Sequence, residues 1–260
     1  LLFLYLHGGY KEMWDKPHLQ DPALPRNISA YVRESIDKGW SKVHPPEDRS
    51  PKAYIFTGGN PLRRWPSPQV AKEHLWPKFE MIVSVNFRMS TSALFSDYVL
   101  PVAAYFEKYG IKYAQTYVPY IICSDKATEP LGESKSDWET FGLLSKAVAD
   151  RAKARGVTLV RGLKDKQFDL SKVYDVHTHN GKYDPTDPED PVKLMDAIFA
   201  GSPSVGASSG REALQMGAVP IIGTGRPSLI DQNYTTYDPK DTHWPHRDFV
   251  EKKIAWPTLT

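Results

Sequence analysis

The chain has 260 residues, of which 40% are hydrophobic and 25% charged, the composition of an ordinary globular protein. Its 33 basic and 31 acidic residues give a net charge of +2, so composition provides no basic surface for nucleic acid. Cys123 is the only cysteine, which excludes an internal disulfide and a thiolate-bound zinc ion or iron–sulfur cluster built from this sequence alone.

Both ends of the sequence are apolar. The run LLFLYL (1–6) predicts a buried strand; it is far too short to span a bilayer and has no charged region before it, unlike a signal peptide. The last residues, KKIAWPTLT (252–260), have the apolar and β-branched content of a strand being entered. Because chain ends are usually polar, we expect an excerpt of a longer polypeptide.

Two further apolar runs, AYIFT (53–57) and MIVSVNF (81–87), predict strands of a parallel sheet that is covered on both faces. Between them, SPQVAKEHLW (67–76) predicts a helix, with Ser67 as its N-cap and Pro68 at its first position. A strand, a glycine turn, a helix and a second strand make a right-handed βαβ unit. The sequence therefore predicts an α/β fold.

The same pattern continues along the chain. A short helix over 91–95 and a strand, YVLPVA (98–103), follow the βαβ unit, and VTLV (157–160) predicts another strand. The clearest helix begins at Asp137 after a capping box and ends before Gly156. Its apolar residues are predicted to form one face: Trp138, Phe141, Leu144, Val148 and Ala152.

The character of the sequence changes at Arg161. Residues 161–190 are polar and rich in turn formers, two helices are predicted over 191–200 and 208–216, and residues 223–250 are again irregular. We therefore predict a domain over 1–160 and an irregular, partly helical extension over 161–260.

The stretch YIFTGGNPLRR (54–64) contains a candidate ligand-binding turn. Gly58 and Gly59 allow a ligand to approach the backbone closely, and ligands bind at the carboxyl ends of parallel strands. Asn60 would offer its amide to a polar group. The alternative is a purely structural strand-to-helix turn, which the local pattern slightly favours because it is neither GxGxxG nor a P-loop. The two arginines have no assigned role.

The next predicted strand also ends at an amide, Asn86, the same topological position as Asn60. Downstream, Asp97, Glu107 and Lys108 are charges among apolar residues. If buried, such charges must be paired or must bind something; otherwise they lie on a solvated loop, and the sequence leaves both possibilities open.

Two other motifs carry weaker signals. DVHTH (175–179) resembles a metal-binding strand of amidohydrolases, but no apolar barrel strand precedes it, so a polar surface loop is favoured. His243 and His246 have no helical or strand context. GASSGREALQMG (206–217) has a helix start that could face an anion, although no apolar strand leads into it. No nucleophile–base pattern stands out.

A specific succession of motifs resembles the molybdopterin oxidoreductases of the dimethyl sulfoxide reductase family. The resemblance extends over residues 53–155 and consists of GGNPL, IVSVNFRMSTSALFSDYVLP, FEKYG and EPLGESKSDWETFGLLSKAVADRA, in that order. Within the family, it points to the subgroup of ethylbenzene dehydrogenase, dimethyl sulfide dehydrogenase, and the perchlorate, chlorate and selenate reductases. Within that subgroup, the sequence most resembles the hydrocarbon dehydrogenases. Hydrocarbon hydroxylation is therefore the first expectation, and oxyanion reduction or dimethyl sulfide oxidation is the alternative.

The resemblance implies a catalytic subunit that holds molybdenum between two pterin guanine dinucleotides. It implies a Rossmann-like, doubly wound sheet layer that binds one dinucleotide, leading toward a C-terminal barrel domain that lies outside this sequence. The residues carried over as cofactor contacts are Gly58, Gly59, Asn60, Val85, Asn86, Lys108 and Asp137. Lys108 would meet a phosphate or pterin oxygen, and Asp137 would accept from a guanine or ribose donor.

The family's N-terminal cysteine motif for a 4Fe-4S cluster, its molybdenum-ligating segment and most of its substrate pocket have no counterpart here. This stretch is therefore expected to hold cofactor without catalysing a reaction alone. The resemblance implies an iron–sulfur electron-transfer subunit and a haem b subunit as partners, a small-molecule substrate and a periplasmic location. The contrasting hypotheses are a self-contained α/β nucleotide-binding module without catalysis and a metal-dependent hydrolase built on DVHTH.

Overall fold

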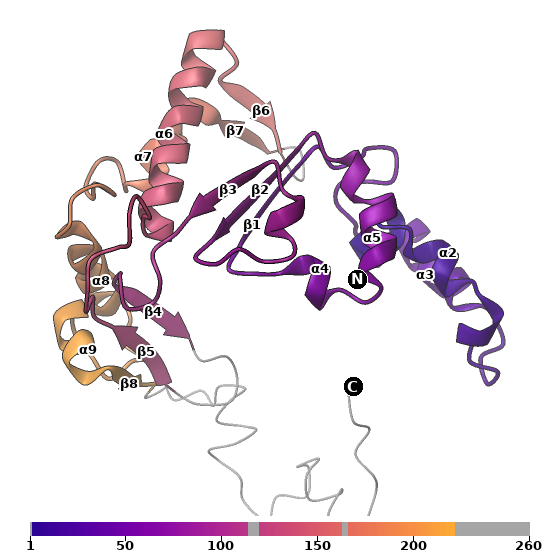
Figure 1. The fold of residues 1–260 in the computed structure, drawn as a ribbon, viewed down its shortest axis with the longest axis horizontal. Helices are drawn as coiled ribbons and strands as arrows, with labels where there is room; N and C mark the ends of the chain where they lie inside the picture. The colour runs from indigo at the N-terminus through magenta and orange to yellow at the C-terminus, as the bar shows by residue number, and fades with distance from the viewer. Residues whose placement is uncertain (1, 114–119, 163–165, 222–260) are drawn as a thin grey trace, which may run out of the picture. The chain divides into compact units, whose positions relative to one another are not determined.

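The computed structural model describes residues 2–113, 120–162 and 166–221 (Figure 1). The chain divides into two compact units, unit 1 over Leu1–Val102 and unit 2 over Ala103–Thr260. The predicted cofactor-binding domain over 1–160 and extension over 161–260 stay a prediction. The irregular segment 223–250, His243, His246 and the strand expected at the C-terminus lie outside the described residues.

Unit 1 combines short helices with three strands. Its elements are α1 (Leu2–His7), α2 (Tyr10–Trp14), η1 (Pro17–Leu19), α3 (Ile28–Asp37), β1 (Ala53–Thr57), α4 (Pro61–Arg64), α5 (Pro68–His74), η2 (Trp76–Lys78), β2 (Met81–Asn86), η3 (Ala93–Phe95) and β3 (Tyr98–Pro101).

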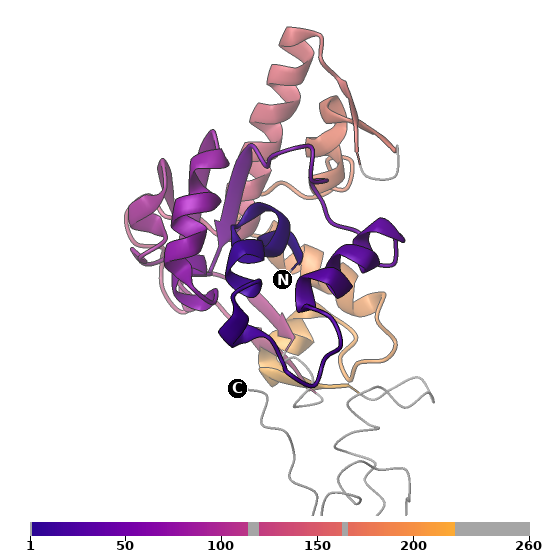
Figure 2. The ribbon, with the colours of Figure 1, turned by 90° about the vertical axis from the view of Figure 1, so that its right-hand side faces the viewer.

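Residues Leu2–His7 form the helix α1, so the predicted N-terminal strand is wrong. A short apolar run does not distinguish a strand from a buried helix. Here the helix ends at His7, and Gly8 and Gly9 lead into a second helix. Leu4 and Tyr10 of these helices are buried against Leu75, next to α5. Figures 1 and 2 show the indigo N-terminal helices beside α5 in both views.

The sheet of unit 1 is parallel, in the order β1-β2-β3, which confirms the α/β class and the predicted βαβ unit. The central strand β2 is buried from Ile82 to Asn86. At the edges, Ile55 of β1 and Tyr98 of β3 are 40% and 61% exposed, so the expected cover on both faces holds only for the centre of the sheet. The doubly wound arrangement stays a prediction.

An aromatic cluster fixes the start of β1 to the helices that follow it. The ring of Tyr54 stacks on Phe79 with centroids 5.2 Å apart and contacts Trp65 and Trp76 at 6.0 and 6.1 Å. The helix between β1 and β2 begins at Pro68 as predicted, but Ser67 does not cap it. Its φ of 49° turns the side chain away, and its Oγ donates to the sulfur of Met13 instead.

Unit 2 contains two small antiparallel sheets and four helices in its described residues. Its elements are β4 (Gly110–Tyr113), β5 (Tyr120–Ser124), α6 (Asp137–Arg155), β6 (Leu159–Arg161), β7 (Gln167–Asp169), η5 (Leu170–Lys172), α7 (Val173–His177), α8 (Asp190–Ala200), α9 (Gly210–Met216) and β8 (Ala218–Pro220). One sheet has the order β4-β5-β8, and β6 pairs with β7. One hydrophobic core lies between β5, β8, α8 and α9, where Cys123, Met195, Phe199 and Val219 are buried.

The long helix α6 begins and ends as predicted, but its predicted apolar face is only partly buried: Ala152 is buried, and Trp138 and Phe141 are half-buried. Ser136 Oγ accepts a hydrogen bond from the Glu139 backbone N–H at 3.1 Å, and the left-handed Gly156 ends the helix. Leu144 and Val148, from the predicted apolar face, are 38% and 37% exposed. The residues buried along α6 are Gly142, Ala149 and Ala152.

Close packing explains this choice of small residues. A Cβ atom on Gly142 would lie 2.5 Å from Cγ of Pro185, in the segment that follows α7, and 3.1 Å from Nε2 of His177. Only a residue without a side chain fits between α6 and this segment. Hydrophobicity patterns reward large apolar residues, so they miss Gly142 and Ala149 here.

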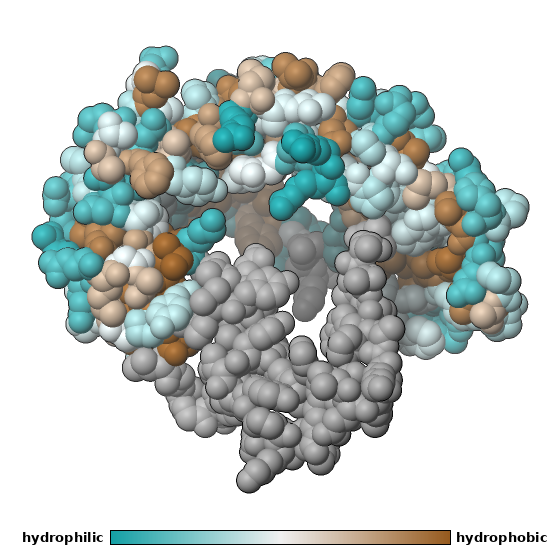
Figure 3. Space-filling model, turned by 60° about the horizontal axis from the view of Figure 1, so that its bottom comes forward, coloured by the Kyte–Doolittle hydropathy of each residue, from teal (hydrophilic) through white to brown (hydrophobic). Residues whose placement is uncertain are grey.

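The remaining predictions for unit 2 are mostly confirmed. The strand predicted over 157–160 is β6, shifted by one or two residues, and the helices predicted over 191–200 and 208–216 are α8 and α9. The segment 161–190, expected to be irregular, contains β7 and α7. On the face drawn in Figure 3, hydrophobic residues are interspersed with hydrophilic ones. Among the described residues, no helix has the length and apolar character needed to cross a membrane.

Candidate functional site

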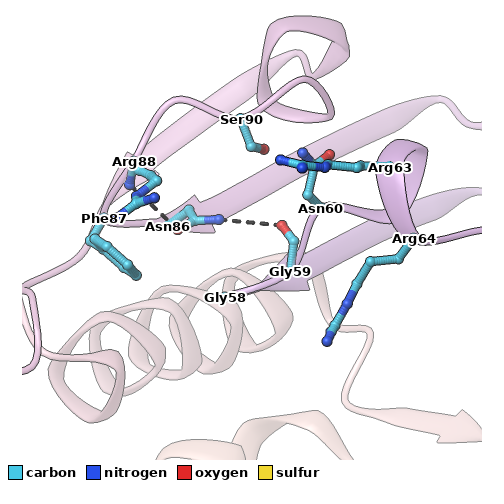
Figure 4. Close-up of a pocket in the computed structure, with 9 residues that line it drawn as sticks. All are labelled: Gly58, Gly59, Asn60, Arg63, Arg64, Asn86, Phe87, Arg88 and Ser90. Carbon is cyan, nitrogen blue, oxygen red and sulfur yellow. Dashed lines mark hydrogen bonds between the residues drawn. The ribbon is translucent and has the colours of Figure 1, made fainter.

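A pocket of about 530 Å³ lies at the carboxyl ends of β1 and β2 in unit 1 (Figure 4). This is the edge of a parallel sheet where ligands bind, because the loops that leave adjacent strands diverge there. Its lining residues are Gly58, Gly59, Asn60, Arg63, Arg64, Asn86, Phe87, Arg88 and Ser90. Four of the seven predicted contact residues, Gly58, Gly59, Asn60 and Asn86, therefore lie around one pocket.

The glycine turn shapes the floor of this pocket. Gly58 has a φ of 59°, and its N–H donates to the carbonyl of Val85 at 3.1 Å, which ties the end of β1 to β2. A Cβ atom on Gly58 would meet nothing within 4 Å, so the space beside it is open to a ligand. Val85, predicted as a contact, is 1% exposed and its carbonyl is already used by the protein.

The amide of Asn60 is held in one orientation by Ser92. Asn60 Oδ1 accepts from the Ser92 backbone N–H at 3.1 Å and from Ser92 Oγ at 2.7 Å. Ser92 Oγ in turn accepts from the Leu62 N–H at 2.9 Å. A backbone N–H can only donate, so the oxygen of the amide must face Ser92. The Nδ2 group of Asn60 is then left for a ligand.

Asn86 joins the two strand ends. Its Nδ2 donates to the carbonyl of Gly59 at 3.3 Å, and its Oδ1 accepts from the Arg88 backbone N–H at 3.4 Å. Both bonds are drawn in Figure 4. Asn86 is 7% exposed, so it stabilises the turns that form the pocket. A direct contact between Asn86 and a cofactor stays a prediction.

Three arginines surround the pocket. Arg63 and Arg64 lie on α4, and Arg88 follows β2; all three are exposed. In the described part of the chain none of them forms an ion pair with a carboxylate, and no acidic residue lines the pocket. Figure 4 shows Arg63 extending across Asn60 toward Ser90, whereas Arg64 points to the other side of the turn. The pocket therefore favours an anion.

Lys108 and Asp137 form an ion pair with each other. Both belong to unit 2, and the Nζ of Lys108 contacts Oδ2 of Asp137 at the first residue of α6. The side chains are 17% and 42% exposed. In the structure, Lys108 and Asp137 are therefore each other's partners. That they contact the same cofactor as the pocket of unit 1 stays a prediction.

Comparisons with known proteins identify the family. The family model for molybdopterin oxidoreductases matches residues 23–147 of the chain. The chain is 30% identical to the alpha subunit of respiratory nitrate reductase from Haloferax mediterranei, in an alignment that covers 100% of this chain and 26% of that protein. The chain belongs to the molybdopterin oxidoreductase family.

Two other members of the family are similar over much of the chain. The perchlorate reductase alpha subunit of Dechloromonas aromatica is 30% identical over 88% of this chain and 23% of its own length. The dimethylsulfide dehydrogenase alpha subunit of Rhodovulum sulfidophilum is 31% identical over 68% and 20%. The chain therefore spans about a quarter or less of the length of these relatives. They confirm the family recognised from the motif order.

Family membership and the described residues both argue against a metal site at DVHTH. His177 Nε2 is hydrogen-bonded to the carbonyl of Trp138 at 2.9 Å, and its ring stacks on that indole. His179 is exposed and contacts the ring of Tyr183. Among residues 2–113, 120–162 and 166–221, no group of three or more His, Cys, Asp or Glu side chains could hold a metal ion. The hydrolase hypothesis is therefore wrong for the described residues.

The other charged candidates have local roles. Asp97 accepts from the Ile82 N–H at 2.7 Å, and Glu107 accepts from the Ala104 N–H at 2.7 Å. At the start of α9, the hydroxyl of Ser209 accepts from the Glu212 N–H, so this helix start is capped by its own residues.

Sequence reasoning missed Ser92 and the three arginines. Ser92 is completely buried, in a stretch whose sequence marks it only as a small polar residue between two strands. The arginines carried a visible signal, because Arg63 and Arg64 directly follow the Asn-Pro turn at a predicted strand end. Their unpaired state in the described residues became visible only in three dimensions.

Proposed function

We propose that this chain is part of the catalytic subunit of a molybdenum-dependent oxidoreductase that reduces an oxyanion. Its α/β layer would hold one pterin guanine dinucleotide at the carboxyl ends of β1 and β2. Family membership supports the cofactor class, and the names of the nitrate and perchlorate reductase relatives support the substrate class. The single structural observation that carries the proposal is the cationic pocket at the strand ends.

The residues present fit a phosphate-bearing dinucleotide. Gly58 leaves open space beside the backbone, Asn60 presents Nδ2, and Arg63, Arg64 and Arg88 supply cationic donors without a carboxylate in the pocket lining. When bound, the molybdenum cofactor supplies oxygen-atom and two-electron exchange with the substrate. The described residues of this chain bind and orient the dinucleotide, and none of them is assigned a proton transfer.

The first expectation, hydrocarbon hydroxylation, has less support than its alternative. The nitrate and perchlorate reductases both take their names from an oxyanion. In such a reaction the oxyanion loses one oxygen atom, which leaves as water after taking up two protons and two electrons. Oxidation of dimethylsulfide is a second candidate, because a dimethylsulfide dehydrogenase subunit is 31% identical over 68% of the chain.

The electrons must come from a partner. We propose an iron–sulfur electron-transfer subunit and a haem b subunit, a 4Fe-4S cluster in a part of the protein outside this sequence, and a periplasmic location. The relatives' names, which call them alpha subunits, support a multi-subunit complex. Purification of the full-length subunit with its co-expressed neighbours tests this: iron, haem and a second polypeptide should co-elute, and a catalytic subunit that elutes alone, without iron or haem, contradicts it.

The decisive experiment measures cofactor and substrate in the same preparation. The full-length subunit should contain molybdenum and release guanosine monophosphate on acid hydrolysis, in a ratio of about two nucleotides per metal because the cofactor has two dinucleotides. Reduced viologen should be oxidised by nitrate, chlorate or perchlorate. A preparation without molybdenum or nucleotide refutes the cofactor assignment. A loaded enzyme that oxidises dimethylsulfide or a hydrocarbon, and reduces none of the oxyanions, refutes only the substrate class.

A further inference from the structure

The side chains of the strand-end pocket offer mainly hydrogen-bond donors. Its three arginines carry only N–H groups, and a guanidinium has no acceptor. The side-chain acceptors of the lining already accept hydrogen bonds inside the protein: Asn60 Oδ1 from Ser92, Asn86 Oδ1 from the Arg88 N–H, and Ser90 Oγ from the Ala93 N–H. The Gly59 carbonyl accepts from Asn86 Nδ2.

Ser92 decides the character of the Asn60 amide. It is fully buried and contacts Asn60 Oδ1 twice, through its N–H and its hydroxyl. Rotation of the amide by 180° would place Nδ2 against the Ser92 N–H, two donors facing each other, and would leave that buried N–H without a partner. The hydroxyl of Ser92 is itself fixed, because it accepts from the Leu62 N–H. The pocket therefore receives Nδ2 and not the oxygen.

We propose that this pocket is the diphosphate site of the dinucleotide, with Arg63, Arg88 and Asn60 Nδ2 as its donors and Ser92 as the residue that positions Asn60. Phosphate oxygens only accept hydrogen bonds, so they match a set of donors. The edges of guanine and of a pterin present donors and acceptors together, so side chains that mainly donate match them less well. This inference rests on the proposed function and assigns one part of the cofactor to one set of side chains.

The geometry in Figure 4 assigns different weights to the arginines. Arg63 lies across Asn60 on the side of Ser90, so its guanidinium and the Asn60 amide can contact one phosphate group. Arg88 follows Asn86 on the neighbouring strand end, and its guanidinium lies 5.2 Å from the ring centre of Phe87. Arg64 points to the opposite side of the turn, so it is not counted among the diphosphate donors.

The first test uses the full-length holoenzyme. We would measure guanosine monophosphate released per subunit before and after gel filtration in 1 M salt, for the wild type, the double variant Arg63→Gln/Arg88→Gln, and the control Arg49→Gln. Arg49 is also exposed and without an ion pair in the described residues, but it lies outside the pocket. The double variant should lose dinucleotide at least tenfold faster in salt, and the control should match the wild type. Equal retention in all three overturns the inference.

A second test identifies the group that the pocket recognises. The full-length subunit, produced without cofactor, is titrated with inorganic diphosphate, guanosine diphosphate and guanosine. Diphosphate and guanosine diphosphate should each bind at least tenfold more weakly to the double variant, with a smaller dependence on salt. Guanosine binding should be unchanged. If the double substitution weakens guanosine and leaves diphosphate unaffected, the pocket holds the base, and the inference is wrong.

The role of Ser92 is tested by a cycle with Asn60. Asn60→Asp keeps the oxygen toward Ser92 but replaces the donor with a carboxylate, so it should weaken diphosphate binding more than Asn60→Ala. Ser92→Ala should weaken it about three- to tenfold in the wild type and not at all in the Asn60→Ala background. Equal losses in both backgrounds would mean that Ser92 acts on the fold in general and does not position Asn60. A wild type without molybdenum and nucleotide would instead refute the proposed function itself.

Discussion

The two units differ in whether the cationic side chains near the predicted site are paired with a carboxylate. In the described part of unit 1, the arginines beside the strand-end pocket have no carboxylate partner, whereas in unit 2 the predicted contact Lys108 is paired with Asp137. A cation without a partner contributes its full interaction to an incoming anion. A paired cation must first give up its partner, so its net contribution to binding is smaller. Whether a predicted contact residue can bind a ligand therefore depends on the protein groups that it already contacts.

The two units also pack by opposite means. In unit 1, large rings of Tyr54, Trp65, Trp76 and Phe79 fill the space between β1 and the following helices. Along α6 of unit 2, small residues allow the neighbouring segment to approach closely. Unit 1 should therefore be sensitive to the removal of side-chain volume, and α6 to its addition.

Removal of the central ring should have the largest effect. Tyr54→Ala deletes the side chain that contacts four other rings, and truncation of such an aromatic residue costs about 3 kcal/mol. Hydrogen exchange of β1 and β2 amides in the full-length subunit measures this locally. Exchange should become faster in β1 and β2 and stay unchanged in α6. Loss of protection in both units alike would contradict the local packing argument.

Addition of volume to α6 should have the next largest effect. Gly142→Val places a branched side chain where even Cβ would lie 2.5 Å from Pro185, and overpacking of this kind costs about 2 kcal/mol. Amide exchange of α6 and α7 reports the change. Ala147→Val is the matched control, because Ala147 is exposed on the same helix and its substitution costs only the lower helix propensity, about 0.5 kcal/mol. Equal effects of the two substitutions would mean that the close contact is unimportant.

The ion pair of unit 2 should respond asymmetrically. Asp137→Asn leaves Lys108, whose side chain is only 17% exposed, without its partner and should cost about 1 kcal/mol. Lys108→Met leaves Asp137 half exposed at the start of a helix, where a carboxylate is stabilised, so its cost should be smaller. Exchange of the first turn of α6 measures both. If nucleotide content falls with either substitution while α6 is unchanged, the pair opens to the cofactor, as the family resemblance implies.

The sequence predicted the fold well where local signals and tertiary packing agree. The strands β1 and β2, with a glycine turn and helix between them, and the capped helix α6 all follow from residue patterns. The strand prediction for the N-terminal segment was wrong because a run of six apolar residues fits either a strand or a buried helix. The prediction for the buried face of α6 was right for Ala152 but missed Gly142, because the contact with Pro185 is nonlocal and selects a glycine over larger residues.

The candidate site was predicted in part for the same reason. Gly58, Gly59, Asn60 and Asn86 stand at strand ends, and strand ends can be located from the sequence. Whether an amide faces a ligand or the protein depends on side chains distant along the chain. Ser92, 32 residues after Asn60, decides this and carries no pattern of its own.

The smallest effect that we expect depends on pH and again concerns Tyr54. Burial raises the pKa of its hydroxyl above the ordinary value of 10.0, so the folded state binds this proton more tightly than the unfolded state. The associated stability is complete below pH 10 and is lost as the pH rises through the folded-state pKa; up to pH 10.5 the loss is about 0.8 kcal/mol at most.

Tyr54→Phe keeps the ring and removes the titrating group, so it separates this pH effect from packing. At pH 7 the variant should match the wild type within about 0.5 kcal/mol in the exchange of β1 amides. Between pH 9.5 and 10.5 the wild type should lose protection in β1, after correction for the intrinsic exchange rate, and the variant should lose less. Tyr10, whose pKa is also raised by burial, is present in both proteins and cancels in the comparison. Parallel losses in the two proteins would show that the hydroxyl of Tyr54 does not limit the stability of unit 1, because a group that is no longer present cannot titrate.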